Sequence, residues 1–448
     1  MNALLLLSPP MQSVLILGVG ALMLLALGNV FTRAPVRTQL TGCLFAALAA
    51  LPALRAAGLD VVAIGAPCAL GVTALLLMRE AELEFGEHHL DGSGLVLLGA
   101  AGGVVLGTAG ELVSLLLGLE TLSLTVAVLC GLGRGERSLE AAFKFFVLAA
   151  VSLGVLVYGT GLFAYATGSF ALGAPPLQPS LLPVYQTAVV LLVLGIAFEL
   201  AVVPLHFGAL SAYMAMPTAL ATFAATAGKV GAGIALLRVA AQVELGIAGP
   251  VLQALGTASI AWATFAGFAQ RDLRGVLAYS AVGHAGFLAI AIGCGPDGRQ
   301  PAVLYLLVYA ASTALTFAGL ADRGTRPIPL QSFRSDPLPP GRALAVVLGL
   351  LSLAGMPPGP GLWAKVGVLV PAWNAGSPMV ATLAALGGVF SALYYLRPVP
   401  DLLASIRRRP AEPRPAASAG ALLLGALAVA LFAAAPWLGS QLAQSAAR

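Results

Sequence analysis

The sequence predicts an all-α integral membrane protein, and its composition, its apolar segments and its arginines each support that prediction. Of the 448 residues, 59% are hydrophobic and only 9% are charged, which lies far outside the range of soluble domains. Apolar segments of about 17 to 30 residues, long enough to cross a bilayer, recur along the whole chain. The arginines fall between these segments or at their ends, as expected for the loops of a membrane protein.

We expect about fourteen transmembrane helices. The first has no basic leader and no small-residue cleavage site, so we expect it to be retained rather than removed as a signal peptide. The expected spans are 11–31, 38–56, 61–78, 93–109, 111–132, 139–166, 184–207, 217–238, 249–270, 275–295, 301–320, 342–371, 377–397 and 418–437.

The arginines also predict the orientation of the chain. Sixteen of the twenty arginines follow odd-numbered spans, and four lie on the other side. Because basic loop residues favour the cytoplasmic side, we expect both termini on the non-cytoplasmic side of a bacterial inner membrane. The net charge of +5 is scattered through short loops and forms no basic stripe, so no nucleic-acid partner is expected.

Two of the expected spans are interrupted by proline. Pro204 lies in the seventh span (GIAFELAVVPLHF), and Pro357, Pro358 and Pro360 lie in the twelfth (LSLAGMPPGPGLWAKVG). Broken helices in corresponding places mark the inverted repeats of transporters, so we expect two inverted five-helix repeats with a broken helix fourth in each. The expected parts of the chain are a three-helix segment with an acidic loop (1–92), the first repeat (93–238), the second repeat (239–397), and a cytoplasmic linker with a C-terminal helix (398–448).

Ionisable residues inside the spans are the candidate functional residues. A charged side chain at mid-membrane costs about 2.5–3.5 kcal/mol on insertion scales and is rare without a function. The chain has only three lysines, and all three lie in expected spans. A buried lysine titrates readily whereas arginine stays charged, so this distribution predicts proton chemistry. The candidate proton-pathway residues are Glu120, Lys144, Glu199, Lys229, His284 and Lys365.

Most of these candidates also have a purely structural interpretation. Glu120 could be a neutral acid that is hydrogen-bonded between helices, and Lys144 could extend its amine back to the cytoplasmic interface. His284, like His206 beside Pro204, could be a hydrogen-bonded core histidine. Lys229 is flanked by small residues that permit close helix packing, so its partner could be either Glu120 or Glu199.

No metal site or cofactor is expected in this chain. The acidic loop at 79–92 combines four glutamates with His88 and His89, and we interpret it as a solvated or partner-docking surface rather than a metal site. The four cysteines lie in or beside apolar segments without C-x-x-C spacing, which favours structural thiols. The sequence contains no GxGxxG fingerprint, no iron–sulfur cysteine pattern and no flavin motif.

Five stretches together resemble a known family. GLETLSL, RSLEAAFKFFVLAAVSLGVLVYGTGLFAYATGS, FELAVVPLHF, RDLRGVLAYSAVGHAG and LLSLAGMPPGPGLWAK are similar, in order and spacing, to the antiporter-like membrane subunits of respiratory complex I. The resemblance covers about residues 95–396 and is strongest to subunit N of NADH-quinone oxidoreductase. Related hydrogenase and Mrp-type complexes contain similar subunits.

The resemblance implies a proton-translocating membrane-arm subunit that works with other antiporter-like subunits. NADH, FMN, iron–sulfur clusters and quinone would then be bound by partner subunits, and this chain alone would perform no redox catalysis. The family's functional residues correspond to Glu120 on the fifth span, Lys144 on the sixth, Lys229 on the eighth, His284 on the tenth and Lys365 on the twelfth.

One position departs from the family pattern. The family usually has lysine on the broken seventh span, where this chain has Glu199. Glu199 could pair with Lys229, or one of the two carboxylates, Glu120 or Glu199, could stay protonated. The proton channel of the first expected repeat could also be slowed or unused. Two other functions stay open: a non-conducting structural subunit of the membrane arm, and a subunit of a hydrogenase or Mrp-type cation/proton antiporter complex.

Overall fold

The computed structural model describes residues 7–31, 35–78, 89–133, 135–357 and 359–407. Within these ranges the secondary structure is helical apart from two isolated β-bridges, and twelve helices are long and apolar enough to cross a membrane. The prediction of an all-α membrane protein is therefore confirmed. Most of the acidic loop, Pro358, the end of the cytoplasmic linker and the last expected span at 418–437 lie outside the described residues, so the number fourteen stays a prediction.

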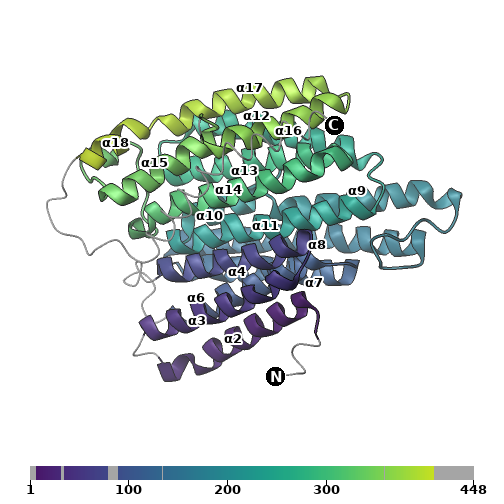
Figure 1. The fold of residues 1–448 in the computed structure, drawn as a ribbon, viewed down its shortest axis with the longest axis horizontal. Helices are drawn as coiled ribbons and strands as arrows, with labels where there is room; N and C mark the ends of the chain where they lie inside the picture. Colours follow the sequence, from purple (N-terminus) through teal and green to yellow (C-terminus); the bar gives the residue numbers. More distant parts are fainter. Residues whose placement is uncertain (1–6, 32–34, 79–88, 134, 358, 408–448) are drawn as a thin grey trace. The chain divides into compact units, whose positions relative to one another are not determined.

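The chain divides into two compact units, and each is described by itself. The first consists of Met1–Ala201 and Phe207–Val251, and the second of Val202–His206 and Leu252–Arg448. Within each unit the helices run side by side in similar directions (Figure 1).

The first unit is built around helix α11. α11 (Thr218–Gln242) is the one candidate span in the described chain whose most apolar window is completely buried, whereas only 28% of the corresponding window of α8 is buried. Small residues allow this burial: a Cβ added at Gly231 would lie 3.3 Å from the backbone of Gly103 on α6. The other helices are α2 (Pro9–Phe31), α3 (Pro35–Ala50), α4 (Leu59–Met78), α6 (His89–Thr108), α7 (Leu112–Gly131), α8 (Glu136–Thr167), α9 (Leu182–Glu199) and α10 (Phe207–Ala215), with 3₁₀ turns at Leu51–Arg55 and Pro179–Leu181.

The second unit places helix α13 (Leu273–Gly293) at its centre, with 89% of its most apolar window buried. Asp272 caps this helix, since its side chain accepts hydrogen bonds from the amides of Arg274 and Gly275. The other helices are α12 (Ala248–Ala269), whose first turn belongs to the first unit, α14 (Arg299–Gly319), α15 (Pro340–Ala354), α16 (Pro360–Asn374), α17 (Pro378–Leu396) and α18 (Val399–Arg407), with 3₁₀ turns at Gly295–Gly298, Ala321–Arg323 and Ser332–Arg334.

The seventh expected span is two helices, and the break is longer than expected. α9 ends at Glu199 and helix resumes as α10 at Phe207, so residues 200–206 are not helical. Ala201 has a left-handed φ of 61°, and Pro204 has no N–H to continue a helix. The second half of the broken helix then runs to Ala215. The expected spans assign no helix to residues 208–216.

The twelfth expected span, 342–371, is also divided. α15 ends at Ala354 because Gly355 takes a left-handed φ of 77°, which closes helices at low steric cost. α16 begins at Pro360, a residue suited to the first position of a helix. Both expected helix breaks are therefore present.

The second helix of each expected repeat begins in the same way. α7 follows Glu111, which forms a β-bridge with Ala171, and α13 follows Asp272, which forms a β-bridge with Pro329. Each bridge ties the start of one helix to the loop after the next helix. This likeness supports the two five-helix repeats, which stay a prediction.

A partly buried arginine joins three helices of the first unit. Arg238 of α11 pairs with Asp60 of α4 and donates from Nε to the carbonyl of Gly107 on α6. We expect Arg238→Ala to cost about 1–3 kcal/mol of stability because it leaves the partly buried carboxylate unpaired. Heating the purified assembled protein and measuring the chain that stays soluble tests this. The exposed pair Lys144–Glu140 is the control, and Glu140→Ala should change little; equal losses from both variants would contradict the expectation.

Candidate functional site

In each unit a buried lysine contacts the backbone at a helix break. Lys229 of α11 donates a hydrogen bond to the carbonyl of Leu200, directly after α9. Lys365 of α16 donates at 2.9 Å to the carbonyl of Ala354, the last residue of α15. Carbonyls at a helix C-terminus lack intrahelical partners and carry partial negative charge, so they can hold an ammonium group. The same arrangement thus occurs once in each unit, with lysines that are only 2% and 7% exposed.

Glu199 lies beside Lys229 in the first unit. It is the last residue of α9 and is 5% exposed, and its Oε2 accepts a hydrogen bond of 2.8 Å from Ser123 Oγ on α7. Glu199 and Lys229 interact electrostatically, although their charged groups are not in direct ion-pair contact in the described structure. Of the two partners that the sequence left open for Lys229, Glu199 is the one that interacts with it electrostatically in the described residues.

Gly228 makes room for the Glu199 carboxylate. A Cβ added at Gly228 would lie 2.8 Å from Glu199 Oε1, which is closer than non-bonded atoms can approach without moving. The glycine that precedes Lys229 in the chain therefore lets the end of α9 press an acidic side chain against α11.

Glu120 and Lys144 lie outside this cluster. Glu120 is half-buried on α7, and its Oε2 is buried without a hydrogen-bond partner among the described residues. Lys144 is 54% exposed on α8 and pairs with Glu140, one turn earlier. No hydrogen bond or ion pair in the described chain connects either residue to Glu199 or Lys229.

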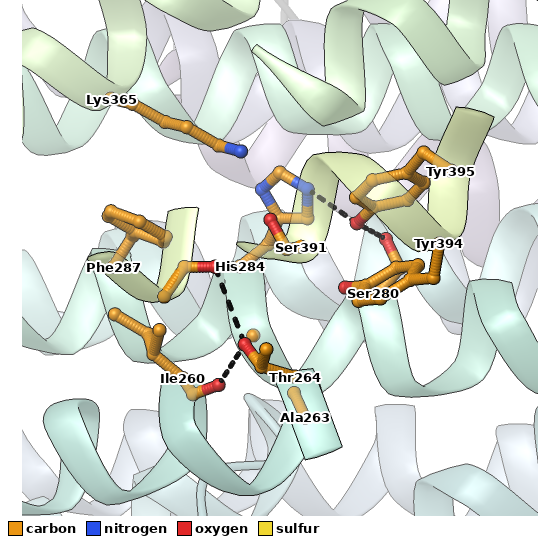
Figure 2. Close-up of a pocket in the computed structure, with 12 residues that line it drawn as sticks. Ile260, Ala263, Thr264, Ser280, His284, Phe287, Lys365, Ser391, Tyr394 and Tyr395 are labelled. Atoms are coloured by element: carbon orange, nitrogen blue, oxygen red, sulfur yellow. Dashed lines mark hydrogen bonds between the residues drawn. The ribbon is translucent and has the colours of Figure 1, made fainter. Parts of the chain in front are cut away.

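In the second unit, Lys365 and His284 line one small cavity (Figure 2). Its volume is about 10 Å³, roughly the space of one water molecule. Ser280 and Tyr395 also line it, and Figure 2 shows the Lys365 amine pointing toward one side of the His284 ring with these two hydroxyls on the other side. A titratable amine and an imidazole thus share a space that a single water could bridge.

Two tyrosines hold the His284 ring from opposite sides. Tyr305 of α14 lies 2.6 Å from Nδ1, and Tyr395 of α17 lies 3.2 Å from Nε2. Tyr309, one turn along α14, packs on the same ring with 5.1 Å between centroids. His284 is therefore hydrogen-bonded and buried, but it also lies beside a titratable lysine.

The break after α9 has its own contacts in the second unit. The Val203 amide donates at 2.9 Å to Ser259 Oγ on α12, and the His206 ring packs edge-on against Trp262 at 6.0 Å. His206 is buried at this contact, which fits the core-histidine interpretation. These contacts fix the non-helical residues of the break.

Four residues of the site were not expected from the sequence: Ser123, Ser280, Tyr305 and Tyr395. Ser280 could have been found, because it lies four residues before His284 and so on the same helix face. The two tyrosines approach from other helices, and the sequence holds no signal of that proximity.

We expect Ser123→Ala to change the environment of the Glu199 carboxyl. The variant removes the hydroxyl that donates to Oε2, while the carboxyl stays buried. Infrared difference spectra of the assembled protein, with the carboxyl band assigned by Glu199→Gln, should show that band shifted. Ser114→Ala on the same helix removes an exposed hydroxyl bonded to Glu111 and is the matched control. Identical bands in the Ser123→Ala and unmodified proteins would contradict the hydrogen bond.

Comparison with known proteins places these features in a family. A family model described as NADH:quinone oxidoreductase/Mrp antiporter, transmembrane, matches residues 109–391, which include both helix breaks and all six candidate residues. The chain belongs to this family. Among curated relatives, subunit 14 of NADH-quinone oxidoreductase from Thermus thermophilus is 36% identical over 342 residues, which are 75% of this chain and 76% of the relative. Subunit N from Rhodobacter capsulatus is 32% identical over 387 residues, 82% and 79% of the two chains.

Solved structures of the family share the fold. A chain of respiratory complex I from Thermus thermophilus superposes with a TM-score of 0.80 at 33% identity and covers 96% of this chain and 98% of its own length. A chain of the Mrp complex from Dietzia superposes with a TM-score of 0.78 at 18% identity, covering 98% and 97%. The second likeness concerns the fold alone. The resemblance inferred from the five sequence stretches is thus confirmed.

Proposed function

We propose that the chain is a proton-translocating membrane-arm subunit of an NADH-quinone oxidoreductase, corresponding to subunit N. The observation that carries the proposal is the buried lysine at each helix break, Lys229 at Leu200 and Lys365 at Ala354. An ammonium group that is bonded to a carbonyl and forms no direct ion pair can release its proton and regain it, whereas arginine in the same place could not. Relatives named as subunits 14 and N of this enzyme support the assignment.

In the proposed mechanism each unit provides one buried lysine that takes up and releases protons. Lys229 exchanges protons under the influence of the nearby Glu199 carboxylate, because a charge at contact distance contributes a few kcal/mol at an effective dielectric near 20. Lys365 exchanges protons with the cavity that it shares with His284. Protons enter from the cytoplasm near Lys144 and Lys229 and leave near Lys365.

The redox chemistry belongs to other subunits in this proposal. The relatives' names refer to NADH and quinone, and in the described residues no group of three or more His, Cys, Asp or Glu side chains is arranged to hold a metal ion. We place NADH, FMN, iron–sulfur clusters and quinone in partner subunits. In this proposal the chain lies beside those subunits in a bacterial inner membrane, and both of its termini are on the non-cytoplasmic side.

A second candidate is cation/proton antiport, because the family description includes Mrp antiporters. Inverted membrane vesicles that carry the assembled complex separate the two functions. Proton uptake that accompanies NADH oxidation in sodium-free buffer supports the first proposal, and uptake that requires added sodium supports antiport. A scaffold role predicts that Lys229→Ala and Lys365→Ala leave proton uptake unchanged.

A further inference from the structure

His284 and three neighbouring side chains form one continuous chain of hydrogen bonds in the second unit. Tyr305 contacts Nδ1 at 2.6 Å, Nε2 contacts Tyr395 at 3.2 Å, and the Tyr395 hydroxyl donates to Ser280 Oγ at 2.5 Å. The members come from three helices: α14, α13 and α17. We propose that this chain is a directional proton relay through His284, in which Tyr305, Tyr395 and Ser280 take part. The inference rests on the proposed proton-translocating function and adds these three hydroxyls to it.

The hydroxyl hydrogens fix the tautomer of His284. A tyrosine hydroxyl has one hydrogen, and that of Tyr395 is donated to Ser280. Tyr395 therefore presents a lone pair to Nε2, and Nε2 must carry the imidazole proton. In a neutral ring Nδ1 is then an acceptor, so the Tyr305 hydroxyl donates to it. Every bond in the chain points the same way, from Tyr305 to Ser280.

The relay connects two separate small cavities. The cavity at its Tyr305 end is lined by Tyr305, Tyr309, Ser312 and Ser352 and has a volume of about 10 Å³. The cavity at its Ser280 end also measures about 10 Å³ and is the one that Lys365 lines. His284 lines both. Each cavity has about the space of one water molecule, so a proton that moves from one to the other can pass along the bonded side chains.

One passage along the relay conserves every proton. A proton that reaches the Tyr305 oxygen lets Tyr305 pass its own proton to Nδ1, and Nε2 then gives its proton to Tyr395. Tyr395 passes its hydroxyl proton to Ser280, which releases one into the cavity where a neutral Lys365 amine can accept it. His284 ends with its proton on Nδ1, and all hydroxyls have reversed direction. The relay must be reset before the next proton, so it carries one proton per cycle.

The groups that face the ring support a relay rather than a packing role alone. The Lys365 amine lines the same cavity as Ser280 from the other side of the imidazole ring, lies 5.6 Å from the centre of the Phe287 ring, and has no carboxylate partner in the described structure. On the Tyr305 side, Ser312 and Ser352 share a hydrogen bond of 2.7 Å. Hydroxyls therefore continue beyond both ends of the imidazole.

The test measures protons taken up per NADH oxidised in inverted vesicles that carry the assembled complex. Tyr305→Phe and Tyr395→Phe each keep the ring and remove the hydroxyl. Ser280→Ala frees the Tyr395 hydroxyl to donate to Nε2 instead, and it changes no ring at all. We expect each variant to lower the ratio as much as His284→Leu does. Because Ser280→Ala is the smallest change, it decides the question if a tyrosine variant fails to assemble.

Two matched controls remove neighbouring hydroxyls that lie outside the relay. Thr316→Val removes a buried hydroxyl of α14 that donates to the Ser312 carbonyl of its own helix, and Thr257→Val removes a hydroxyl of α12 that donates to the Gln253 carbonyl of its own helix; neither residue lines either cavity. Both should keep the unmodified ratio. In addition, Tyr305→Phe should have no further effect in a His284→Leu background, because residues of one pathway are not additive.

Three results would overturn the relay. The first is an unchanged number of protons per NADH in both Ser280→Ala and Tyr395→Phe. The second is an unchanged number in His284→Leu, and the third is a further loss when Tyr305→Phe is added to His284→Leu. Each of these can occur while Lys229→Ala and Lys365→Ala still lower the ratio, in which case the proposed function stands. If neither lysine variant lowers the ratio, the proposed function itself fails.

Discussion

Replacing Gly361 with alanine is expected to prevent normal assembly of the protein. A Cβ at this position would overlap the Ser352 carbonyl oxygen, far inside an ordinary contact distance. Both atoms belong to backbone segments at the break, one near the end of α15 and one at the start of α16, so no side-chain rotation relieves the clash. Overpacking against side chains typically costs about 1–3 kcal/mol, and a backbone clash costs more.

Gly341→Ala provides the matched control for this prediction. Gly341 lies on α15, and a Cβ there meets nothing within 4 Å. Alanine is also the better helix former by about 0.5–1 kcal/mol, so this variant should assemble normally. The amount of the chain recovered in the purified complex measures both effects. Equal recovery of the Gly361→Ala and Gly341→Ala variants would show that α15 and α16 do not approach as closely as described.

The second large effect is expected at Lys229. Lys229→Ala removes the titratable amine and leaves the Leu200 carbonyl and the Glu199 carboxylate without a nearby cation. Positioned acid–base groups contribute about 100-fold or more to proton transfer, so we expect the proton flux through this chain to fall by about 100-fold. The initial rate of proton uptake by inverted vesicles, divided by the rate of NADH oxidation, measures this loss.

Lys229→Arg separates loss of proton transfer from loss of structure. Arginine keeps the positive charge that the Leu200 carbonyl and Glu199 face, but it does not release its proton. We therefore expect Lys229→Arg to assemble and still to lower proton uptake. Arg334→Ala, which removes an arginine whose side chain is 75% exposed, controls for the effect of changing a basic residue. An arginine variant with normal proton uptake would show that Lys229 serves only as a charge.

Much of the fold could be predicted because its signals are local. Apolar segments long enough to cross a bilayer give the helices, and prolines 204, 357 and 360 give the two breaks. The extent of the first break could not be predicted, because α9 ends at Glu199, well before the proline. The position at which α9 ends depends on contacts of the non-helical segment, such as the hydrogen bond from the Val203 amide to Ser259. Contacts of this kind cannot be predicted from the local sequence pattern.

The candidate site was predictable in its residue types but less so in its pairings. Lys229 and Lys365 stand out as buried lysines in apolar segments, and the structure places both at helix ends. Their acceptors are backbone carbonyls, which any sequence contains, so these contacts leave no trace in the residue pattern. Burial could not be predicted for Lys144. Its span is as apolar as those of the other two lysines, yet this lysine lies on the exposed face of α8.

The central claim is that protons pass through this chain by way of its two buried lysines. The most direct test is the number of protons taken up per NADH oxidised in vesicles whose complex carries Lys229→Arg or Lys365→Arg. We expect a lower ratio in each variant at normal levels of assembled complex. An unchanged ratio in both would contradict it and leave the chain as a scaffold of the membrane arm.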